Sequence, residues 1–166
     1  MSAAPPAQDR AARLGLEPHP EGGYFRRIYT APRTVGTSGG ERPLATSIYY
    51  LLDRRQPLGR LHRNRSDILH FLVDGGPLEY LLLDAGGVLR RQRLGPGEGE
   101  ARFLLVPGGC WKASQLLEPA AHALVAEVVT PGFDYADHEF AREEDLRREH
   151  PAQLAALARF VTPAAR

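Results

Sequence analysis

The sequence predicts a single all-β domain, an antiparallel jelly-roll β-barrel with short helices at its C-terminal end. Three observations favour this fold: short apolar segments recur from Tyr24 onward, breakers rich in Gly and Pro separate them, and no helical pattern lies between them. The 17 Gly and 14 Pro exceed ordinary usage, as is typical of a chain with many tight turns. With 166 residues and a hydrophobic fraction of 43%, the chain has the size and composition of one domain with its own core.

Nine segments have the length and apolar content of strands. Several alternate in character, so that one face is buried and the other faces water; in the first strand, one face carries Phe25, Arg27 and Tyr29. The strands are predicted at residues 23–30, 45–52, 60–64, 68–73, 78–84, 88–94, 101–106, 111–117 and 123–129. Turn residues at 39–40, 75–77, 85–87, 95–97 and 107–109 separate them.

Helical character is predicted only at the C-terminal end. Residues 141–149 begin with three acidic side chains, whose charge suits a helix N-terminus. Pro151 can open a second helix at its first position. We expect the apolar stripe of that helix to pack on the barrel through Leu154, Leu157 and Phe160. Residues 1–13, rich in Ala and Pro, are expected to be a flexible or loosely docked leader, and residues 14–162 to form the domain.

Composition argues against several classes of function. The 21 basic and 20 acidic residues nearly cancel, which gives no electrostatic basis for binding nucleic acid or an anionic membrane. No apolar run approaches the roughly 18 residues of a membrane span. Cys110 is the single cysteine, so an intramolecular disulfide and a cysteine-rich zinc site are excluded. The leader lacks the apolar core of a signal peptide, and we expect a cytoplasmic protein.

Eight short segments carry a recognisable pattern: HPEGGYFR at 19–26, SIYYLL at 47–52, HRNRS at 62–66, ILHF at 68–71, VPGG at 106–109, WKAS at 111–114, PGFD at 131–134 and DH at 137–138. In content and order they resemble the cupin superfamily, and specifically its Cupin_5 group. The resemblance implies a jelly-roll barrel, usually a homodimer, with a pocket inside the barrel. It implies no particular activity.

General cupins bind a metal through two His and a Glu of a first motif and a His of a second motif. The resemblance places these four ligands at His62, Asn64, Ile68 and Lys112. Ile68 cannot bind a metal, and an ammonium group at Lys112 would repel a cation. The turn residues of the two motifs are kept at Gly75, Pro107 and Gly109. We therefore expect neither the usual cupin metal site nor any other cofactor.

Strand alternation directs several polar side chains into the pocket. His62 and Asn64 share one face, and we expect His70, Lys112 and Ser114 to point inward as well. A histidine suits general acid–base catalysis, and a lysine in an apolar pocket could hold a carboxylate or phosphate or form a Schiff base. Each group also has a structural alternative, in which it only satisfies hydrogen bonds in the core.

Glu127 lies in an apolar run and needs a cation if both faces of its strand are buried. It is either one half of a core ion pair or a catalytic carboxylate with a raised pKa. Lys112 is expected to pair with Glu127 or Glu79, or else to await an anionic ligand.

Phenol groups are the remaining candidates for the pocket. We assign Tyr50 as a proton donor and Tyr24 and Tyr80 to ligand binding, although phenols at such depths are often only wall residues.

Two loops carry further candidates. Glu21, between His19 and two glycines, belongs either to a turn that docks the N-terminal segment or to a lip over the pocket that contacts ligand. Asp134, Asp137 and His138 offer three metal-binding groups, but their loose spacing favours a solvated loop.

The sequence leaves three functions open. The first is a metal-independent enzyme that moves protons on a small metabolite or sugar derivative, as an isomerase, epimerase, cyclase or lyase; the metal-free cupin epimerases of deoxysugar metabolism are similar at a distance. His62 would be the base, Lys112 would hold an anionic oxygen and a tyrosine would return the proton. The second is a non-catalytic ligand-binding or sensory cupin. The third is a metal-dependent oxygenase that uses His62 and His70.

Overall fold

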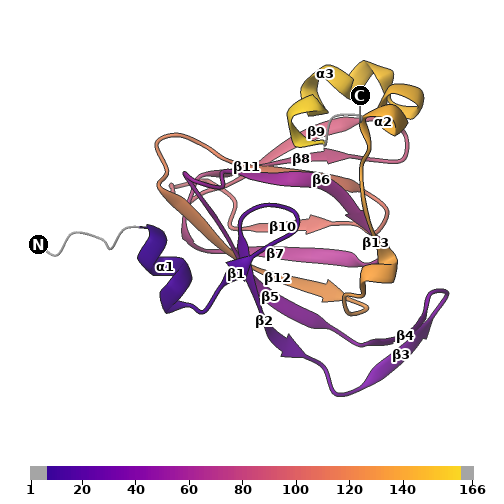
Figure 1. Cartoon of the computed structure of the whole chain (residues 1–166), viewed down its shortest axis with the longest axis horizontal. Helices are drawn as coiled ribbons and strands as arrows, with labels where there is room; N and C mark the ends of the chain where they lie inside the picture. Colours follow the sequence, from indigo (N-terminus) through magenta and orange to yellow (C-terminus); the bar gives the residue numbers. More distant parts are fainter. Residues whose placement is uncertain (1–6, 162–166) are drawn as a thin grey trace, which may run out of the picture.

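The chain folds into two antiparallel sheets that lie face to face (Figure 1). The computed structural model describes residues 7–161. One sheet has the order β1 (Glu17–Pro18), β2 (Tyr24–Thr30), β5 (Thr46–Asp53), β12 (His122–Thr130), β7 (Asp67–Gly75) and β10 (Phe103–Val106). The other has the order β13 (His138–Phe140), β6 (Leu58–Asn64), β11 (Trp111–Leu116), β8 (Leu78–Leu83) and β9 (Leu89–Leu94). This arrangement confirms the jelly-roll fold, and each of the nine predicted strands is present.

Alternation along the strands divides the apolar residues between two cores. On β8, Tyr80 and Leu82 point between the sheets and pack with Tyr50, Leu52 and Val125. The intervening Leu81 and Leu83 point to the other side of the sheet. Because both faces of β8 are covered, its sequence reads as a nearly continuous apolar run rather than as alternation.

The C-terminal helices cover the outer face of the five-stranded sheet (Figure 1). Leu157 and Phe160 pack against Leu81 and Trp111 of the sheet, which confirms the predicted stripe; Leu154 is partly buried against the same cluster. Pro151 occupies the first turn of a 3₁₀ segment, as expected. The elements are α2 (Glu143–Glu149), η2 (Pro151–Gln153), α3 (Leu154–Leu157) and η3 (Ala158–Phe160).

The structure contains several short elements that the sequence does not predict. Residues 7–13 of the expected leader form helix α1 (Ala7–Arg13), which contradicts the prediction of helices only at the C-terminal end; residues 1–6 lie outside the described part of the chain. Ala11 of α1 is buried with Leu51 and Leu124 on the outer face of the six-stranded sheet. The hairpin of β3 (Thr34–Thr37) and β4 (Gly40–Pro43), the 3₁₀ turn η1 (Tyr135–Asp137) and β13 are too short and too polar to show a periodic pattern.

A bulge in β2 corrects the predicted face of that strand. Arg27 pairs with Ile48, and Tyr29 pairs with the adjacent residue of β5, Ser47. Ile28 therefore has no partner of its own and is the extra residue of the bulge. Phe25 and Arg27 therefore share an inner face, whereas the side chain of Tyr29 is exposed.

The outer surface carries an apolar stripe at the β7–β10 edge. It consists of Phe71, Val73, Phe103 and Leu105, and the rings of Phe71 and Phe103 lie 5.2 Å apart. The homodimer implied by the family resemblance stays a prediction. Within residues 7–161, no helix has the length and apolar character needed to span a membrane.

Candidate functional site

A cavity of about 170 Å³ opens between the two sheets. This volume is below the range of about 300–1,000 Å³ typical of pockets for drug-sized ligands, so it suits a small metabolite. Apolar side chains form most of its wall, among them Phe25, Ile48, Ile68, Val129 and Phe133. Its polar groups are His19, Glu21, Arg27, Thr46, His62, Asn64 and Glu127. Four of the residues selected from the sequence therefore line the cavity: Glu21, His62, Asn64 and Glu127.

The segment from His19 to Gly23 brings Glu21 into the cavity as a turn just before β2. Its backbone is fixed at several points: the Gly22 N–H donates to the His19 carbonyl at 3.0 Å, and the Arg60 N–H donates to the Glu21 carbonyl at 2.7 Å. The Tyr50 hydroxyl donates to the Gly22 carbonyl at 2.8 Å. Glu21 is thereby held in the interior with 8% of its surface exposed.

We expect Gly22→Ala to destabilise the protein and to displace Glu21. Gly22 has φ +95°, and a Cβ there would lie 2.3 Å from the Leu58 carbonyl oxygen. Strain of this kind costs about 1–3 kcal/mol, and the clash adds to it. The measurement is the free energy of unfolding in urea. The matched control is Gly36→Ala, since a Cβ at Gly36 would meet nothing within 4 Å. An equal loss in both variants would contradict the role given to the turn.

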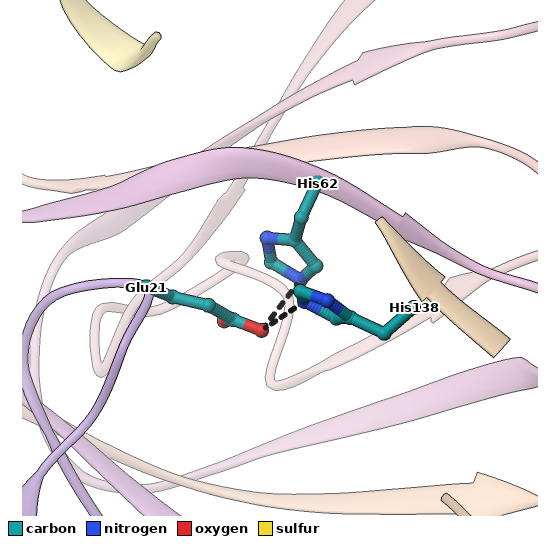
Figure 2. Close-up of side chains that lie close together, drawn as sticks. All are labelled: Glu21, His62 and His138. Carbon is teal, nitrogen blue, oxygen red and sulfur yellow. Dashed lines mark hydrogen bonds and ion pairs between the residues drawn. The ribbon is translucent and has the colours of Figure 1, made fainter. Parts of the chain in front are cut away.

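Glu21, His62 and His138 converge from three different segments on one point (Figure 2). Glu21 Oε1 lies 3.1 Å from His62 Nε2 and 3.2 Å from His138 Nε2. The two imidazole rings stack at 5.2 Å with an interplanar angle of 24°. The other nitrogen of His62, Nδ1, lies 2.6 Å from the Arg60 carbonyl oxygen.

The electrostatics of this group favour a charged carboxylate and a neutral His62. Burial lowers the pKa of His62 to about 4, because the attraction of Glu21 offsets only part of the cost of desolvation, and Lys112 lowers it further. Burial alone would raise the pKa of Glu21, but His62, the hydrogen bond from His138 and the charges of His19 and Lys112 hold it well below the usual range.

A second buried group lies behind the cavity wall, around Glu127. Glu127 Oε2 lies 3.6 Å from Lys112 Nζ, and Glu127 Oε1 lies 3.5 Å from His70 Nε2. The Lys112 ammonium donates to His70 Nε2 at 2.8 Å. Burial raises the pKa of Glu127, and the attraction of Lys112 offsets part of this effect. Burial and the charge of Lys112 hold the pKa of His70 well below its usual value, so His70 is neutral.

Of the two carboxylates expected as partners of Lys112, the structure has Glu127 and not Glu79. Lys112 meets Glu127, whereas Glu79 binds Arg91 at 2.9 Å on the outside of the sheet. His70 is fully buried and Lys112 is 4% exposed, and both point inward as alternation predicted. Neither residue lines the cavity. Both contact Glu127, which does line it.

The remaining candidates are not among the residues that line the cavity. Tyr24 packs on the outer face of the six-stranded sheet, under the Arg55 guanidinium, and does not line the cavity. Tyr50 and Tyr80 lie in the core between the sheets, where burial raises the pKa of each phenol well above 10. Ser114 is buried beside Gly59, whose missing side chain leaves room for the Ser114 hydroxyl. We therefore leave these four residues out of the proposed chemistry.

The residues at the usual cupin metal positions do not fit a metal. Lys112 places an ammonium group where a ligand is needed, and Ile68 contributes only apolar wall. Asn64 offers an amide oxygen, which is buried and has no hydrogen-bond partner within residues 7–161. Only His62 keeps a good ligand, so we derive no step through that metal.

His138 is the residue that sequence reasoning assigned to the wrong environment. The sequence groups it with Asp134 and Asp137 as a solvated loop. In the structure Asp134 accepts from the Ala136 N–H at 2.8 Å, and Asp137 forms a paired ion contact with buried Arg42. His138 points the other way, because β13 pairs with β6 and sets it opposite Asn64. The two carboxylates therefore bind local backbone and Arg42, and only the histidine of this segment joins the interior.

Comparisons with known proteins agree with this fold. The uncharacterized protein YML079W of Saccharomyces cerevisiae is 38% identical over 161 residues, covering 84% of this chain and 80% of the yeast protein. A hypothetical protein from Leishmania major superposes with a TM-score of 0.86 at 30% identity, over 95% of this chain and 99% of that one. Protein SO0799 from Shewanella oneidensis gives a TM-score of 0.87 at 30% identity, over 96% and 99%.

More distant structures share the fold alone. Oxalate decarboxylase from Bacillus subtilis superposes with a TM-score of 0.56 at 16% identity, over 88% of this chain and 37% of that chain. The family model described as Cupin superfamily (DUF985), Cupin_5, matches residues 8–141. The chain therefore belongs to the Cupin_5 family of the cupin superfamily.

Proposed function

We propose that the cavity carries out acid–base proton transfer on a small, anionic, carbonyl-containing metabolite, as an isomerase, epimerase, cyclase or lyase does. The observation that carries this proposal is Glu127, a carboxyl group in the wall of a largely apolar cavity whose pKa is raised by burial. A carboxyl group tuned toward neutral pH in this way is suited to take up and return a proton.

Glu127 is a better candidate for the proton-transfer group than His62. Both ring nitrogens of His62 are engaged, Nδ1 by the Arg60 carbonyl and Nε2 by Glu21. The Glu127 oxygens lie 3.5–3.6 Å from their cationic and imidazole neighbours, which is longer than a strong hydrogen bond. A Glu127 oxygen is thus free to turn toward a substrate C–H group.

The polar groups of the cavity wall suggest the class of substrate. Arg27 supplies a cation to the cavity, which suits a carboxylate or phosphate on the substrate. Asn64 lines the cavity, and its buried amide oxygen, which has no hydrogen-bond partner within residues 7–161, is suited to accept from a substrate hydroxyl once the side chain turns toward it. The aromatic rings of Phe25 and Phe133 suit a short carbon chain.

The proposed step begins with the ionised Glu127. Its oxygen takes a proton from the carbon next to the substrate carbonyl, and the electron pair of the C–H bond moves to form the enolate. The same carboxyl group then returns the proton to a neighbouring carbon or oxygen, or to the original carbon after the planar enolate has turned its other face toward Glu127. Lys112 and His70 position Glu127 from behind and do not contact the substrate.

Deuterium exchange in heavy water tests this proposal. A panel of small 2-oxo and 3-oxo acids and sugar phosphates is first screened for binding by ligand-detected NMR. At least one compound that binds is expected to exchange its α-proton for deuterium. The rate should rise with pH through a pKa above the usual Glu value of about 4.3 and then level off, because the base must be ionised.

A non-catalytic binding protein is the second candidate. It is favoured by the contact between Lys112 and Glu127, which could serve as a core ion pair and nothing more. In that case, compounds would bind in the cavity and none would exchange a proton faster than in buffer alone.

A further inference from the structure

We propose that Glu21, His62 and His138 form a binding site for one divalent first-row transition-metal ion. Two imidazole nitrogens and one carboxylate oxygen lie within 4.8 Å of one another in the interior of the domain. Imidazole and carboxylate together are the ligands that zinc and non-haem iron take in proteins, often with positions left open for substrate. His62 alone belongs to the motif positions of the family, so this is a different ligand set from the usual cupin one.

The distances from the Glu21 carboxylate to the two imidazole nitrogens fit ligands of one ion. Bonds of about 2.0–2.2 Å from a metal to nitrogen and oxygen place neighbouring ligand atoms about 3–3.5 Å apart. The observed separations from Glu21 Oε1 are 3.1 Å to His62 Nε2 and 3.2 Å to His138 Nε2. Figure 2 shows the three side chains directed at this common point.

The hydrogen bond on the far side of His62 prepares it as a ligand. A carbonyl oxygen can only accept, so His62 Nδ1 must carry the proton in its 2.6 Å contact with Arg60. Nε2 is then the ring nitrogen left to bind a metal, and it faces Glu21 Oε1 at 3.1 Å. A backbone carbonyl on the other nitrogen is the usual support of a metal-bound histidine.

The surroundings hold the ligands in place and leave the ion accessible. His62 is 3% exposed, its ring stacks on that of His138, and the ring of Phe140 lies edge-on against His138 at 4.7 Å. Glu21 and His62 line the cavity, so an ion between them would face a bound molecule. Lys112, opposite His62 on β11, has its charge compensated by Glu127.

This inference goes beyond the proposed function, because metal binding needs no proton transfer. If both hold, Glu21, His62 and His138 would hold an ion that supplies Lewis-acid stabilisation of negative charge on the substrate oxygen, while Glu127 takes the proton. An ion with two positive charges beside one carboxylate would also favour an anionic substrate.

Metal titration of the full-length, untagged chain tests the site. The protein is stripped with a chelator and dialysed, then titrated with Zn²⁺ by calorimetry and with Co²⁺ by visible absorption. We expect one ion per chain, with imidazole-type ligand-field bands for Co²⁺. Glu21→Gln and His138→Gln should weaken binding at least 10–100-fold. His150→Gln, at the end of α2, is the matched control and should bind as the unaltered chain does.

Two further variants separate loss of the metal ligands from loss of folding and from loss of proton exchange. His138→Cys replaces one ligand by another, so it should bind Co²⁺ with new thiolate-to-cobalt absorption, which a mere loss of folding cannot produce. Glu127→Gln removes none of the three ligands, so it should still bind one ion per chain even where proton exchange is lost; the uncompensated charge of Lys112 can lower the affinity. Absence of one-to-one binding by the unaltered chain, or equal binding by the Glu21 and His138 variants, overturns the metal site and leaves the proposed proton transfer standing on Glu127. Metal binding without any proton exchange supports the site and removes the proposed function.

Discussion

Glu127→Gln is expected to lower the rate of proton exchange in a bound substrate by about 10²–10⁴-fold, the usual contribution of a general acid–base group. The amide cannot take up the proton, yet it keeps the shape of the side chain and a polar contact for Lys112. Binding of the same compound should change little, since Arg27, Asn64 and the aromatic wall remain. The measurement is the exchange rate by NMR beside the dissociation constant from the same titration.

Glu139→Gln is the matched control for this experiment. It makes the same chemical change one residue from His138, but its side chain is 54% exposed and pairs with Arg63 on the surface. Exchange in this variant should equal that of the unaltered chain. If Glu127→Gln exchanged protons at the full rate, Glu127 would be only the structural partner of Lys112.

Leu81→Ala is expected to lower the free energy of unfolding by about 2–5 kcal/mol, the range for removing a fully buried leucine side chain. Leu81 has no exposed surface and lies in the cluster that joins β8 to the C-terminal helices. The loss combines the transfer of buried methyl groups to water with a cavity that rigid strands cannot close. Urea denaturation measures it.

Leu105→Ala makes the same change on an exposed strand position, where 45% of the residue is exposed. It should alter the free energy of unfolding by no more than about 0.5 kcal/mol. An equally small loss for Leu81→Ala would mean that the helices cover the sheet without contributing to stability.

Much of the fold could be predicted from local patterns. The central strands β5, β8 and β12 are largely apolar, whereas a polar strand such as β9 was predicted mainly from the Gly and Pro breakers on either side of it. Short pieces were missed where the pattern has no room to repeat: β13 has three residues, and β3 and β4 have four each and are largely exposed. The bulge in β2 also escaped, because an extra residue changes pairing without changing composition.

The buried polar cluster could be predicted only in part. Alternation correctly directed His62, Asn64, His70 and Lys112 into the interior, because these residues lie on regular strands with known parity. The need of a buried carboxylate for a cation made Lys112, Arg27 and a histidine candidate partners of Glu127, and in the structure Lys112 and His70 contact it. Tyr24 was selected only as a phenol and not by alternation, and the structure packs it on the outer face of the six-stranded sheet.

The sequence by itself determined the fold class, the family and the inward direction of the polar residues on the central strands, since each follows from periodicity or from short contiguous motifs. Tertiary structure alone decided which polar groups meet. Glu21 comes from a turn fixed by Gly22 and Tyr50, and His138 from a short strand that pairs with β6. These side-chain contacts join residues far apart in the chain, and neither local propensity nor strand parity specifies them.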